Sequence, residues 1–480
     1  MSEVATPPYK VRPAAVAGSF YPADAAHLTA AIDQMLVQAF PAELAGPVVG
    51  LVAPHAGYLY SGPVAASAYA TLRGRKFSRV VVIAPSHCES FSFSSIYDGD
   101  AYATPLGALP VDRAFARRLE QASSSLRLSS HGHAPIGERA EHAIEVQLPW
   151  LQYLLGDFQL LPIVMGEHSY EASRALGVAL AAQMAEDDTL LVASSDLSHY
   201  HPYEEAVAMD HKTLGALADW DYFSMARNLE SRLWEACGGA PIVAAMIAAE
   251  RLGANKAQVL QYANSGDTAG SRDRVVGYGA AALVKSEAAG AEEEMYSLSD
   301  AEKAALLTLA RQSVEQAVRE KRAVEPAAPH LPALLQERGA FVTLHKWGQL
   351  RGCIGFTSAR KPLYLTVRDT AVLASLRDPR FSPVAVSELP DLDYEISVLS
   401  PLRKVLDASR IVVGRDGLLI KRGEREGLLL PQVPSEQGWD RETFLAHTCH
   451  KAGLPPHAWK DDETDIFSFT AAVFGEKKQG

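Results

Sequence analysis

Two apolar segments near the start of the chain end in the same way, with Ala-Pro and then a histidine. They are Leu51-Val-Ala-Pro-His55 and Val80-Val-Val-Ile-Ala-Pro-Ser-His87. Continuous apolar runs of this length are typical of strands that are buried on both faces of a parallel sheet. Ligands of such sheets bind at the carboxyl ends of the strands. The chain is therefore predicted to bring two histidines to one edge of a sheet.

A third apolar run, Thr189-Leu-Leu-Val-Ala-Ser-Ser195, leads directly into Asp196-Leu-Ser-His199. If this run is a further strand of the same sheet, its acidic and imidazole groups reach the same edge. We therefore expect the first part of the chain to support a site at this edge, and the residue types favour a metal site.

The distribution of elements predicts two domains. Residues 1–285 alternate apolar strands with helices, which indicates an α/β layered domain with a mostly parallel sheet flanked by helices. Residues 286–296 are small and acidic, a composition typical of linkers. Residues 297–480 contain runs of strands broken by single helices, which indicates an α+β domain. Its first helix is predicted to start at Ser299, with Glu302 completing a capping box.

Four further elements are predicted from apolar spacing. Helices are expected at 63–72 and in the second half of 131–150. Strands are expected at 410–413 and, as one terminal strand, at 465–474.

Composition and the absence of certain motifs disfavour several classes of function. A net charge of −12 disfavours a nucleic-acid surface or an anionic-membrane binder. Four widely spaced cysteines, without Cys-x-x-Cys, make a disulfide framework or an iron–sulfur cluster site improbable. The sequence has no run of about 18 apolar residues and no signal-peptide pattern at its start, so we expect a cytoplasmic protein. It also lacks Gly-x-Gly-x-x-Gly, a phosphate-binding loop and Gly-x-Ser-x-Gly, so no nucleotide cofactor is predicted.

The third metal ligand is predicted to be Cys237, which lies in a glycine-rich turn before a helix. A helix N-terminus lowers the pKa of a thiol and favours the thiolate that ligates metals. Cys88 directly follows His87 and is expected to point elsewhere. The alternatives stay open: His55 and His87 as hydrogen-bonded structural groups, and Cys237 as a small buried apolar residue.

Two other groups of polar residues are candidates for the same site. Asp196 and His199 suit proton transfer, although Asp196 alternatively caps a helix. Glu141, His142 and Glu145 fall on one side of the predicted helix, where they could orient ligating histidines or bind substrate. Their alternative role is an ordinary solvated helix face.

In the second domain, Leu350-Arg351-Gly-Cys353-Ile-Gly predicts a tight turn. A guanidinium beside Cys353 would lower the pKa of its thiol and give a nucleophilic or redox group. The alternative is a glycine-bracketed buried strand turn. Asp378-Pro-Arg380 is expected to be a loop whose arginine meets an acidic partner.

At these residues the chain resembles two families. Residues 10–285 resemble the Memo-like family (mediator of cell motility). The segments that carry this resemblance are Ala53-Pro-His55-Ala-Gly-Tyr-Leu-Tyr-Ser-Gly62, Pro85-Ser-His87, Glu141-His142-Ala-Ile-Glu145-Val-Gln-Leu-Pro149, Ser194-Ser-Asp196-Leu-Ser-His199-Tyr and Cys237-Gly-Gly.

The Memo-like fold is similar to class III extradiol dioxygenases, which hold non-haem Fe(II) with two histidines and a glutamate. The resemblance places His55 and His87 at the two histidines and Cys237 at the carboxylate. It also places His199 at the acid/base histidine. A thiolate suits copper(I) and iron differently from a carboxylate, and Memo-like proteins are linked to iron and copper binding and to redox chemistry.

Residues 297–475 resemble the AMMECR-type domain, whose biochemistry is unknown. The matching segments are Leu350-Arg-Gly-Cys-Ile-Gly355, Asp378-Pro-Arg-Phe-Ser-Pro383, Glu395-Ile-Ser-Val-Leu-Ser400, Gly427-Leu-Leu-Leu-Pro-Gln-Val433 and the segment from Phe444 to Leu454. Both types of domain occur with a radical-SAM protein in the AmmeMemoRadiSam system, so the resemblance implies such a protein as partner.

Together with the residues, the resemblance implies a protein that binds Fe(II) or a copper ion and performs dioxygenase-like or redox chemistry on an unidentified small molecule. Neither nucleic acid nor a membrane is expected as a partner. The alternative is a non-catalytic scaffold that binds a metal or ligand in a vestigial dioxygenase pocket. Arg351 and Cys353 form the candidate site of the second domain.

Overall fold

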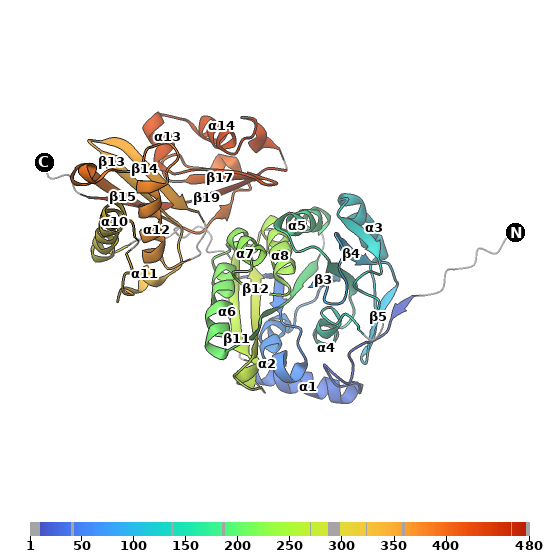
Figure 1. Cartoon of the computed structure of the whole chain (residues 1–480). Coiled ribbons are helices and arrows are strands. Elements are labelled where there is room, and N and C mark those ends of the chain that lie inside the picture. The colour runs from blue at the N-terminus through green and yellow to red at the C-terminus, as the bar shows by residue number, and fades with distance from the viewer. Residues whose placement is uncertain are drawn as a thin grey trace. The chain divides into compact units, whose positions relative to one another are not determined.

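The structure is a computed structural model, in which the chain forms two compact units, Met1–Gly290 and Ala291–Gly480 (Figure 1). The described residues are 10–39, 43–135, 139–184, 188–268, 270–286, 298–322, 324–357, 361–461 and 463–476. The predicted linker, 286–296, lies outside them except for Ser286, so its extent stays a prediction. None of the helices within these ranges combines the length and the apolar composition needed to cross a bilayer.

The first unit is built on a mixed sheet with a parallel centre. The four central strands β2, β9, β3 and β8 pair in parallel, in that order, and antiparallel strands extend the sheet on both sides. From one edge to the other, the described strands are β10 (Asp196–His201), β12 (Val275–Val284), β2 (Val48–Ala53), β9 (Thr189–Ser194), β3 (Arg79–Pro85), β8 (Gln159–Met165), β4 (Ser94–Tyr97) and β7 (Leu126–Ser129), with β11 (Lys256–Asn264) paired to β12.

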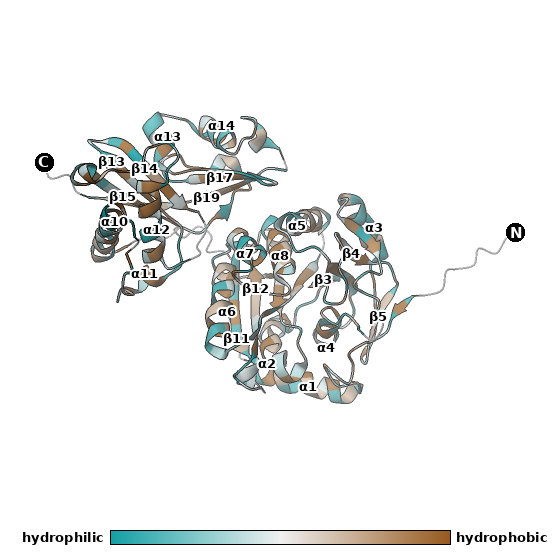
Figure 2. Cartoon of the chain, viewed as in Figure 1, coloured by the Kyte–Doolittle hydropathy of each residue, from teal (hydrophilic) through white to brown (hydrophobic). Residues whose placement is uncertain are grey.

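The central strands are apolar because both of their faces are covered. All six residues of β2 and of β9 are buried. Since side chains alternate along a strand, Leu51 and Ala53 join one core with Val80 and Val82, while the residues between them face the other side. In Figure 2 the strands of each unit carry much of the hydrophobic colour, and the helices around them alternate hydrophilic and hydrophobic residues.

Helices cover both faces of this sheet. The helices α1, α2 and α4 pack together on one face, whereas α5, α7 and α8 pack on the other. The bounds of the helices are α1 (Ala25–Gln38), α2 (Tyr58–Tyr69), α3 (Arg113–Ala122), α4 (Leu148–Leu155), α5 (Tyr170–Met184), α6 (Tyr203–Ala218), α7 (Tyr222–Glu230), α8 (Gly239–Arg251) and α9 (Ser265–Thr268). A smaller sheet contains β1 (Val11–Arg12), β5 (Ala101–Thr104) and β6 (Gly107–Pro110). The predicted α/β layered fold is confirmed.

Two predicted helices of this unit start at other residues. The helix expected at 63–72 begins at Tyr58, because the chain accepts Pro63 inside the helix at the expense of one backbone hydrogen bond. In the segment 131–150, residues 139–144 are not helical, and a 3₁₀ turn at Glu145–Gln147 leads into α4. Pro149 lies in the first turn of α4, where a missing N–H is tolerated.

The second unit contains two antiparallel sheets, which confirms the predicted α+β class. The first, in order, consists of β14 (Gln349–Phe356), β13 (Ala340–Lys346), β15 (Leu392–Leu399) and β20 (Ala471–Gly475). The second consists of β16 (Arg403–Lys404), β19 (Asp465–Phe469), β17 (Gly417–Arg422) and β18 (Arg425–Leu429). The helices are α10 (Asp300–Glu320), α11 (Pro332–Leu335), α12 (Leu363–Leu376), α13 (Gln432–Gln437) and α14 (Arg441–Lys451). Ser299 and Glu302 form the predicted capping box of α10.

Two predicted strands of the second unit are wrong. Residues 410–413 contain no strand: Arg410 ends a 3₁₀ turn and a second turn begins at Val413. The Asp416 carboxylate accepts the N–H of Val412 at 2.7 Å and holds the chain there. The expected single strand at 465–474 is two strands in different sheets, separated at Thr470. There Ser400 N–H donates to the Thr470 carbonyl, and Thr470 N–H donates to Ser400 Oγ, both at 2.9 Å.

Candidate metal centre

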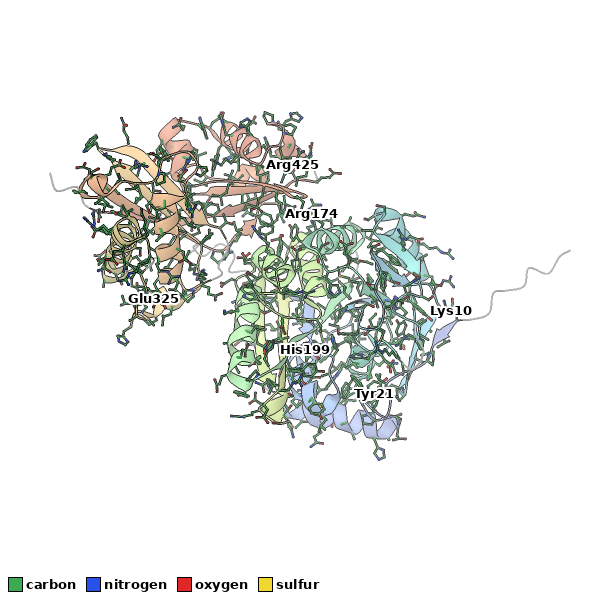
Figure 3. All side chains as sticks on the ribbon, viewed as in Figure 1. Lys10, Tyr21, Arg174, His199, Glu325 and Arg425 are labelled. Atoms are coloured by element: carbon green, nitrogen blue, oxygen red, sulfur yellow. The ribbon has the colours of Figure 1, made fainter. Side chains whose placement is uncertain are left out.

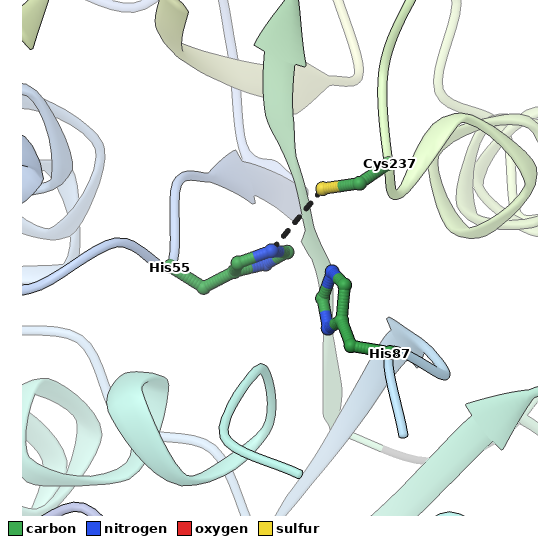
Figure 4. Close-up of side chains that lie close together, drawn as sticks. All are labelled: His55, His87 and Cys237. Atoms are coloured by element: carbon green, nitrogen blue, oxygen red, sulfur yellow. Dashed lines mark hydrogen bonds between the residues drawn. The ribbon is translucent and has the colours of Figure 1, made fainter. Parts of the chain in front are cut away.

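Three side chains from different parts of the first unit meet at the carboxyl end of its parallel strands. His55 follows β2, His87 follows β3, and Cys237 lies in the turn before α8. His55 Nε2 and Cys237 Sγ are 3.2 Å apart, and one donor atom of each of the three residues lies within 4.8 Å of the others. Figure 4 shows the three side chains facing a common space. The predicted convergence of these residues is thus present in the structure.

The strand order explains this convergence. Strand β9 lies between β2 and β3, so the residues that follow β9 lie between the two histidines. The Asp196 carboxylate accepts the backbone N–H of His55 at 2.8 Å and that of Ala56 at 3.3 Å. Asp196 therefore fixes the turn after β2 rather than the start of a helix. Burial raises its pKa to about 6, although both backbone hydrogen bonds act in the opposite direction.

His55 is buried, with 1% of its surface exposed. Its Nδ1 lies 2.9 Å from Ser194 Oγ at the end of β9, and its Nε2 faces Cys237. Burial, followed by the nearby imidazoles of His87 and His142, holds the pKa of His55 well below its ordinary value. At neutral pH the ring is therefore uncharged and has one unprotonated nitrogen.

His87 is more accessible and has a charged partner. Its Nδ1 lies 3.0 Å from Glu141 Oε1, and its backbone N–H donates to Glu141 Oε2 at 2.6 Å. Burial lowers the pKa of His87, but the hydrogen bond and charge of Glu141 outweigh it and the net pKa is raised. Burial likewise raises the pKa of Glu141, yet the contacts with His87 bring it to about 2. Glu141 is therefore ionised, accepts the Nδ1 proton, and leaves His87 Nε2 directed away from the carboxylate.

Cys237 does not have the lowered pKa that its position suggested. It lies two residues before α8, but burial raises the pKa of its thiol, and the nearby Asp196 carboxylate adds to the shift. Burial outweighs the helix N-terminus here because a thiolate is poorly solvated in this environment. The sulfur would ionise readily only beside a cation, which is the behaviour of a metal-binding thiol.

This donor set fits a transition-metal ion. Bonds of about 2.0–2.3 Å from nitrogen and sulfur to one ion allow the 3.2 Å separation between Nε2 and Sγ. In metal sites, the second nitrogen of a ligating histidine is usually bound to a carboxylate, carbonyl or water. His87 follows that pattern through Glu141, and His55 uses a hydroxyl instead. Imidazole with thiolate selects iron, copper or zinc rather than magnesium or calcium.

His199 lies on β10 beside this centre and lines a cavity of about 480 Å³ with Cys237, His168, Arg232 and Trp234. Its label in Figure 3 marks its place in the first unit. Burial lowers the pKa of His199, so the ring is a neutral base at pH 7. The position is compatible with the predicted proton transfer.

The predicted helix face of Glu141, His142 and Glu145 does not exist. Glu141 accepts the backbone N–H groups of His142 and Ala143, and this local bonding competes with a helix. The His142 ring stacks on His87 at a centroid distance of 5.0 Å, and burial lowers its pKa to about 4. His142 thus lines the centre.

Glu145 acts elsewhere. It is fully buried, and its carboxylate accepts hydrogen bonds from Arg12 at 2.6 Å, from Tyr21 at 2.6 Å and from the backbone of Ala15 and Val16. It fixes the N-terminal segment, and these hydrogen bonds involve neither His55 nor His87, so the structure does not support an orienting role for Glu145.

A second group, His87 with Glu141 and His142, also lies within metal-binding distance. Its carboxylate already accepts three backbone N–H groups and the His87 ring nitrogen. A metal ion there would have to replace these bonds, so we assign Glu141 to orienting His87.

Two residues of the centre were not predicted from the sequence. Ser194 and Gln147 are fully buried and hydrogen-bonded to each other behind His55. Both lie in segments singled out above, Ser194 two residues before Asp196 and Gln147 two residues after Glu145, but the spacing within either segment did not indicate that they meet.

The candidate site of the second unit has a different arrangement. Arg351 pairs with Glu388, at 2.9 Å between Nη2 and Oε2, and not with Cys353. Cys353 lies within strand β14 rather than in a tight turn. Burial raises the pKa of its thiol, and the hydrogen bond from Thr343 and the charge of Arg380 do not reverse this. The structure therefore favours the alternative of a glycine-bracketed strand segment over a thiol with lowered pKa.

The chain matches known proteins in two blocks. The sequence profile described as Memo-like protein matches residues 12–282, and the AMMECR1 profile matches residues 307–474. A MEMO1 family protein of Aeropyrum pernix is 38% identical over 281 residues, which are 56% of this chain and 98% of that protein. A protein of Thermococcus onnurineus is 45% identical over 193 residues, which are 38% of this chain and 94% of that protein.

Among solved structures, an uncharacterised protein from Pyrococcus horikoshii is 42% identical and covers 36% of this chain and 90% of its own, with a TM-score of 0.35.

Proposed function

This chain belongs to the Memo-like protein family and carries an AMMECR1 domain behind the Memo-like one, and from that premise we propose that its first unit binds a transition-metal ion through His55, His87 and Cys237. The observation that carries the proposal is the meeting of two imidazole nitrogens and one sulfur within 4.8 Å of one another. The far nitrogen of each ring is already engaged, by Ser194 and by Glu141. The near nitrogens are thus oriented for one ion.

We further propose that the bound ion is iron or copper and that the site performs oxidation chemistry on a small molecule. When bound, either ion supplies a redox-active Lewis acid. The protein supplies two proton-carrying groups: Asp196, with a pKa of about 6, and His199, which is neutral at pH 7. The cavity beside Cys237 has room for a small substrate.

Metal analysis tests the first part. Protein purified without oxygen is expected to retain close to one equivalent of iron or copper after dialysis. The double variant His55→Ala/Cys237→Ala is expected to retain none. Cys449→Ala, which removes a buried thiol in the second unit, is the matched control and should keep the metal. Equal trace metal in all three proteins contradicts the proposal.

Turnover tests the second part. Anaerobic loading with Fe(II), followed by oxygen-uptake measurements with catechols and related small phenols, is expected to show consumption that His199→Gln reduces. A protein that binds the metal fully but consumes no oxygen with any of them is a metal-binding scaffold instead.

We also propose, on the resemblance to the AmmeMemoRadiSam system, that the chain works with a radical-SAM protein. Co-purification of the two proteins from cells that express both tests this; separate elution at micromolar concentrations contradicts a stable complex.

A further inference from the structure

The Ser194 hydroxyl sits at the end of β9 and is fully buried. It contacts three polar groups: the Ala143 carbonyl at 2.6 Å, Gln147 Nε2 at 2.7 Å and His55 Nδ1 at 2.9 Å. A hydroxyl has one proton to donate and two lone pairs that accept. Three partners therefore use its full capacity, and each bond has a defined direction.

Two of the directions follow from the partners. The Ala143 carbonyl can only accept, so the Ser194 proton is donated to it. Gln147 Nε2 can only donate, so it fills one lone pair of Ser194 Oγ. The remaining lone pair faces His55 Nδ1, and that bond forms only if Nδ1 carries a proton.

The orientation of the Gln147 amide is fixed independently. Its Oε1 accepts the Tyr69 hydroxyl at 2.6 Å, and its Nε2 faces the carbonyls of Pro54 at 3.0 Å and Ala53 at 3.3 Å. Rotating the amide by 180° would place its oxygen against these two carbonyl oxygens, a repulsive arrangement in a buried site.

We propose that Ser194 and Gln147 are positioning residues that hold His55 as the tautomer protonated on Nδ1. The lone pair of Nε2 then faces Cys237 Sγ at 3.2 Å, where it can accept the thiol proton in competition with the more distant Asp196 carbonyl at 3.6 Å. The two histidines thus reach the same tautomer by different means, His87 through a carboxylate and His55 through a neutral chain of hydrogen bonds. A neutral chain adds no charge to the buried side of the site.

The assignment of a metal to this tautomer rests on the proposed function, but the tautomer itself does not. Nitrogen-15 NMR of metal-free protein with labelled histidine, at pH 8, separates protonated from unprotonated ring nitrogens. The His55 signals are identified by their loss in His55→Gln. We expect a protonated Nδ1 and an unprotonated Nε2. A protonated Nε2 on His55 overturns the proposal, whatever metal the protein binds.

Variants show whether Ser194 sets the tautomer. Ser194→Ala removes the acceptor, and we expect the Nδ1-protonated signal to be lost or mixed and metal affinity to fall roughly 10- to 100-fold, as for other partners of metal ligands. Gln147→Leu should have a smaller effect in the same direction. Ser95→Ala removes an equally buried hydroxyl that donates to the Ser129 carbonyl instead. This variant should change neither the His55 spectrum nor the metal affinity.

Three results have distinct meanings. An unchanged His55 spectrum in a folded Ser194→Ala variant overturns the positioning role. If that variant does not fold, the wild-type spectrum still decides the tautomer. A correct tautomer in a protein that binds no metal contradicts the proposed function and leaves this inference standing.

Discussion

Cys237 and Cys353 share a local sequence context, with glycines beside the thiol, yet their surroundings differ. Cys237 meets imidazole groups whose near nitrogens have no other partner among the described residues. Cys353 lies among ion pairs that are already complete, Arg351 with Glu388 and Arg380 with Asp378. The comparison teaches that the chemistry of a cysteine motif depends on whether its neighbours have unused donor atoms.

The pairs around Cys353 have a structural role of their own. Strand β14 is an edge strand, and the backbone of Cys353 points outward from it. The Asp378 carboxylate accepts the Cys353 N–H at 2.8 Å, and Arg380 donates to the Cys353 carbonyl at 3.1 Å. The two side chains thus take the positions that a neighbouring strand would occupy, which protects the edge from pairing with another chain.

The sharpest test of the contrast exchanges sulfur for oxygen at each cysteine. Cys237→Ser is expected to weaken metal binding by more than about 100-fold, because even partners of the ligands contribute about 10- to 100-fold. Cys353→Ser should leave the affinity unchanged. Competition titration with a chromophoric chelator measures both affinities. Equal affinities for the two variants would mean that Cys237 contributes no more to metal binding than Cys353 does.

A smaller effect is expected at Glu141, whose carboxylate orients His87. Glu141→Gln keeps the shape but removes the charge, so the pKa of His87 should fall and metal affinity should drop roughly 10- to 100-fold. Glu388→Gln is the matched change in the second unit and should not alter metal binding. Calorimetric titration under anaerobic conditions compares the two, and an unaltered affinity in Glu141→Gln would show that the carboxylate does not support the centre.

The stability of the β14 edge is expected to depend on pH. The hydrogen bond from Arg380 outweighs burial and lowers the pKa of Asp378 to about 2, from an ordinary 3.8. A carboxyl group whose pKa is lowered in the folded state stabilises that state at pH values above its ordinary pKa. This stabilisation is lost as the pH falls from about 4 to about 2. Because Arg380 is half exposed, we expect its ion pair with Asp378 to add at most about 2 kcal/mol to the stability of this edge.

Hydrogen exchange of the Cys353 amide measures this contribution. In Asp378→Asn, protection should be reduced at pH 7, and the difference from the wild type should shrink toward pH 2. A difference that does not vary with pH would mean that the charge of Asp378 has no part in holding the edge.

The smallest effect concerns the reactivity of Cys353. Because burial raises the pKa of its thiol, labelling with iodoacetamide at pH 8 should be several-fold slower than for the same protein unfolded in urea. Mass spectrometry of the labelled peptide measures the labelling rate of Cys353, with Cys353→Ser as the control. Labelling faster than in the unfolded chain would indicate an activated thiol after all.

Much of the first unit could be predicted from the sequence. The apolar runs that end at His55 and His87 are strands, and the position of Cys237 before a helix brings it to the same edge. Parallel strands have strong periodicity and a common ligand-binding end, so local pattern and global position agree there.

The remaining features depend on contacts between distant segments. The loop around Glu141 looked helical because its spacing fits a helix, but its carboxylate binds local backbone groups instead. The role of Ser194 requires Gln147 and Ala143 at once, and no single segment contains all three. The sheet change at Thr470 is set by Ser400, seventy residues earlier. Spacing within one segment cannot reveal such partners.

The insertion of β9 between β2 and β3 determines when the centre can form during synthesis. Both histidine-bearing strands leave the ribosome long before the strand that must separate them, and Cys237 follows later still. A nascent chain can therefore expose two imidazoles without the sulfur or the final spacing between them. If the centre binds a metal as proposed, all three of its ligands are available only after Cys237 has been translated, late in the Memo-like domain.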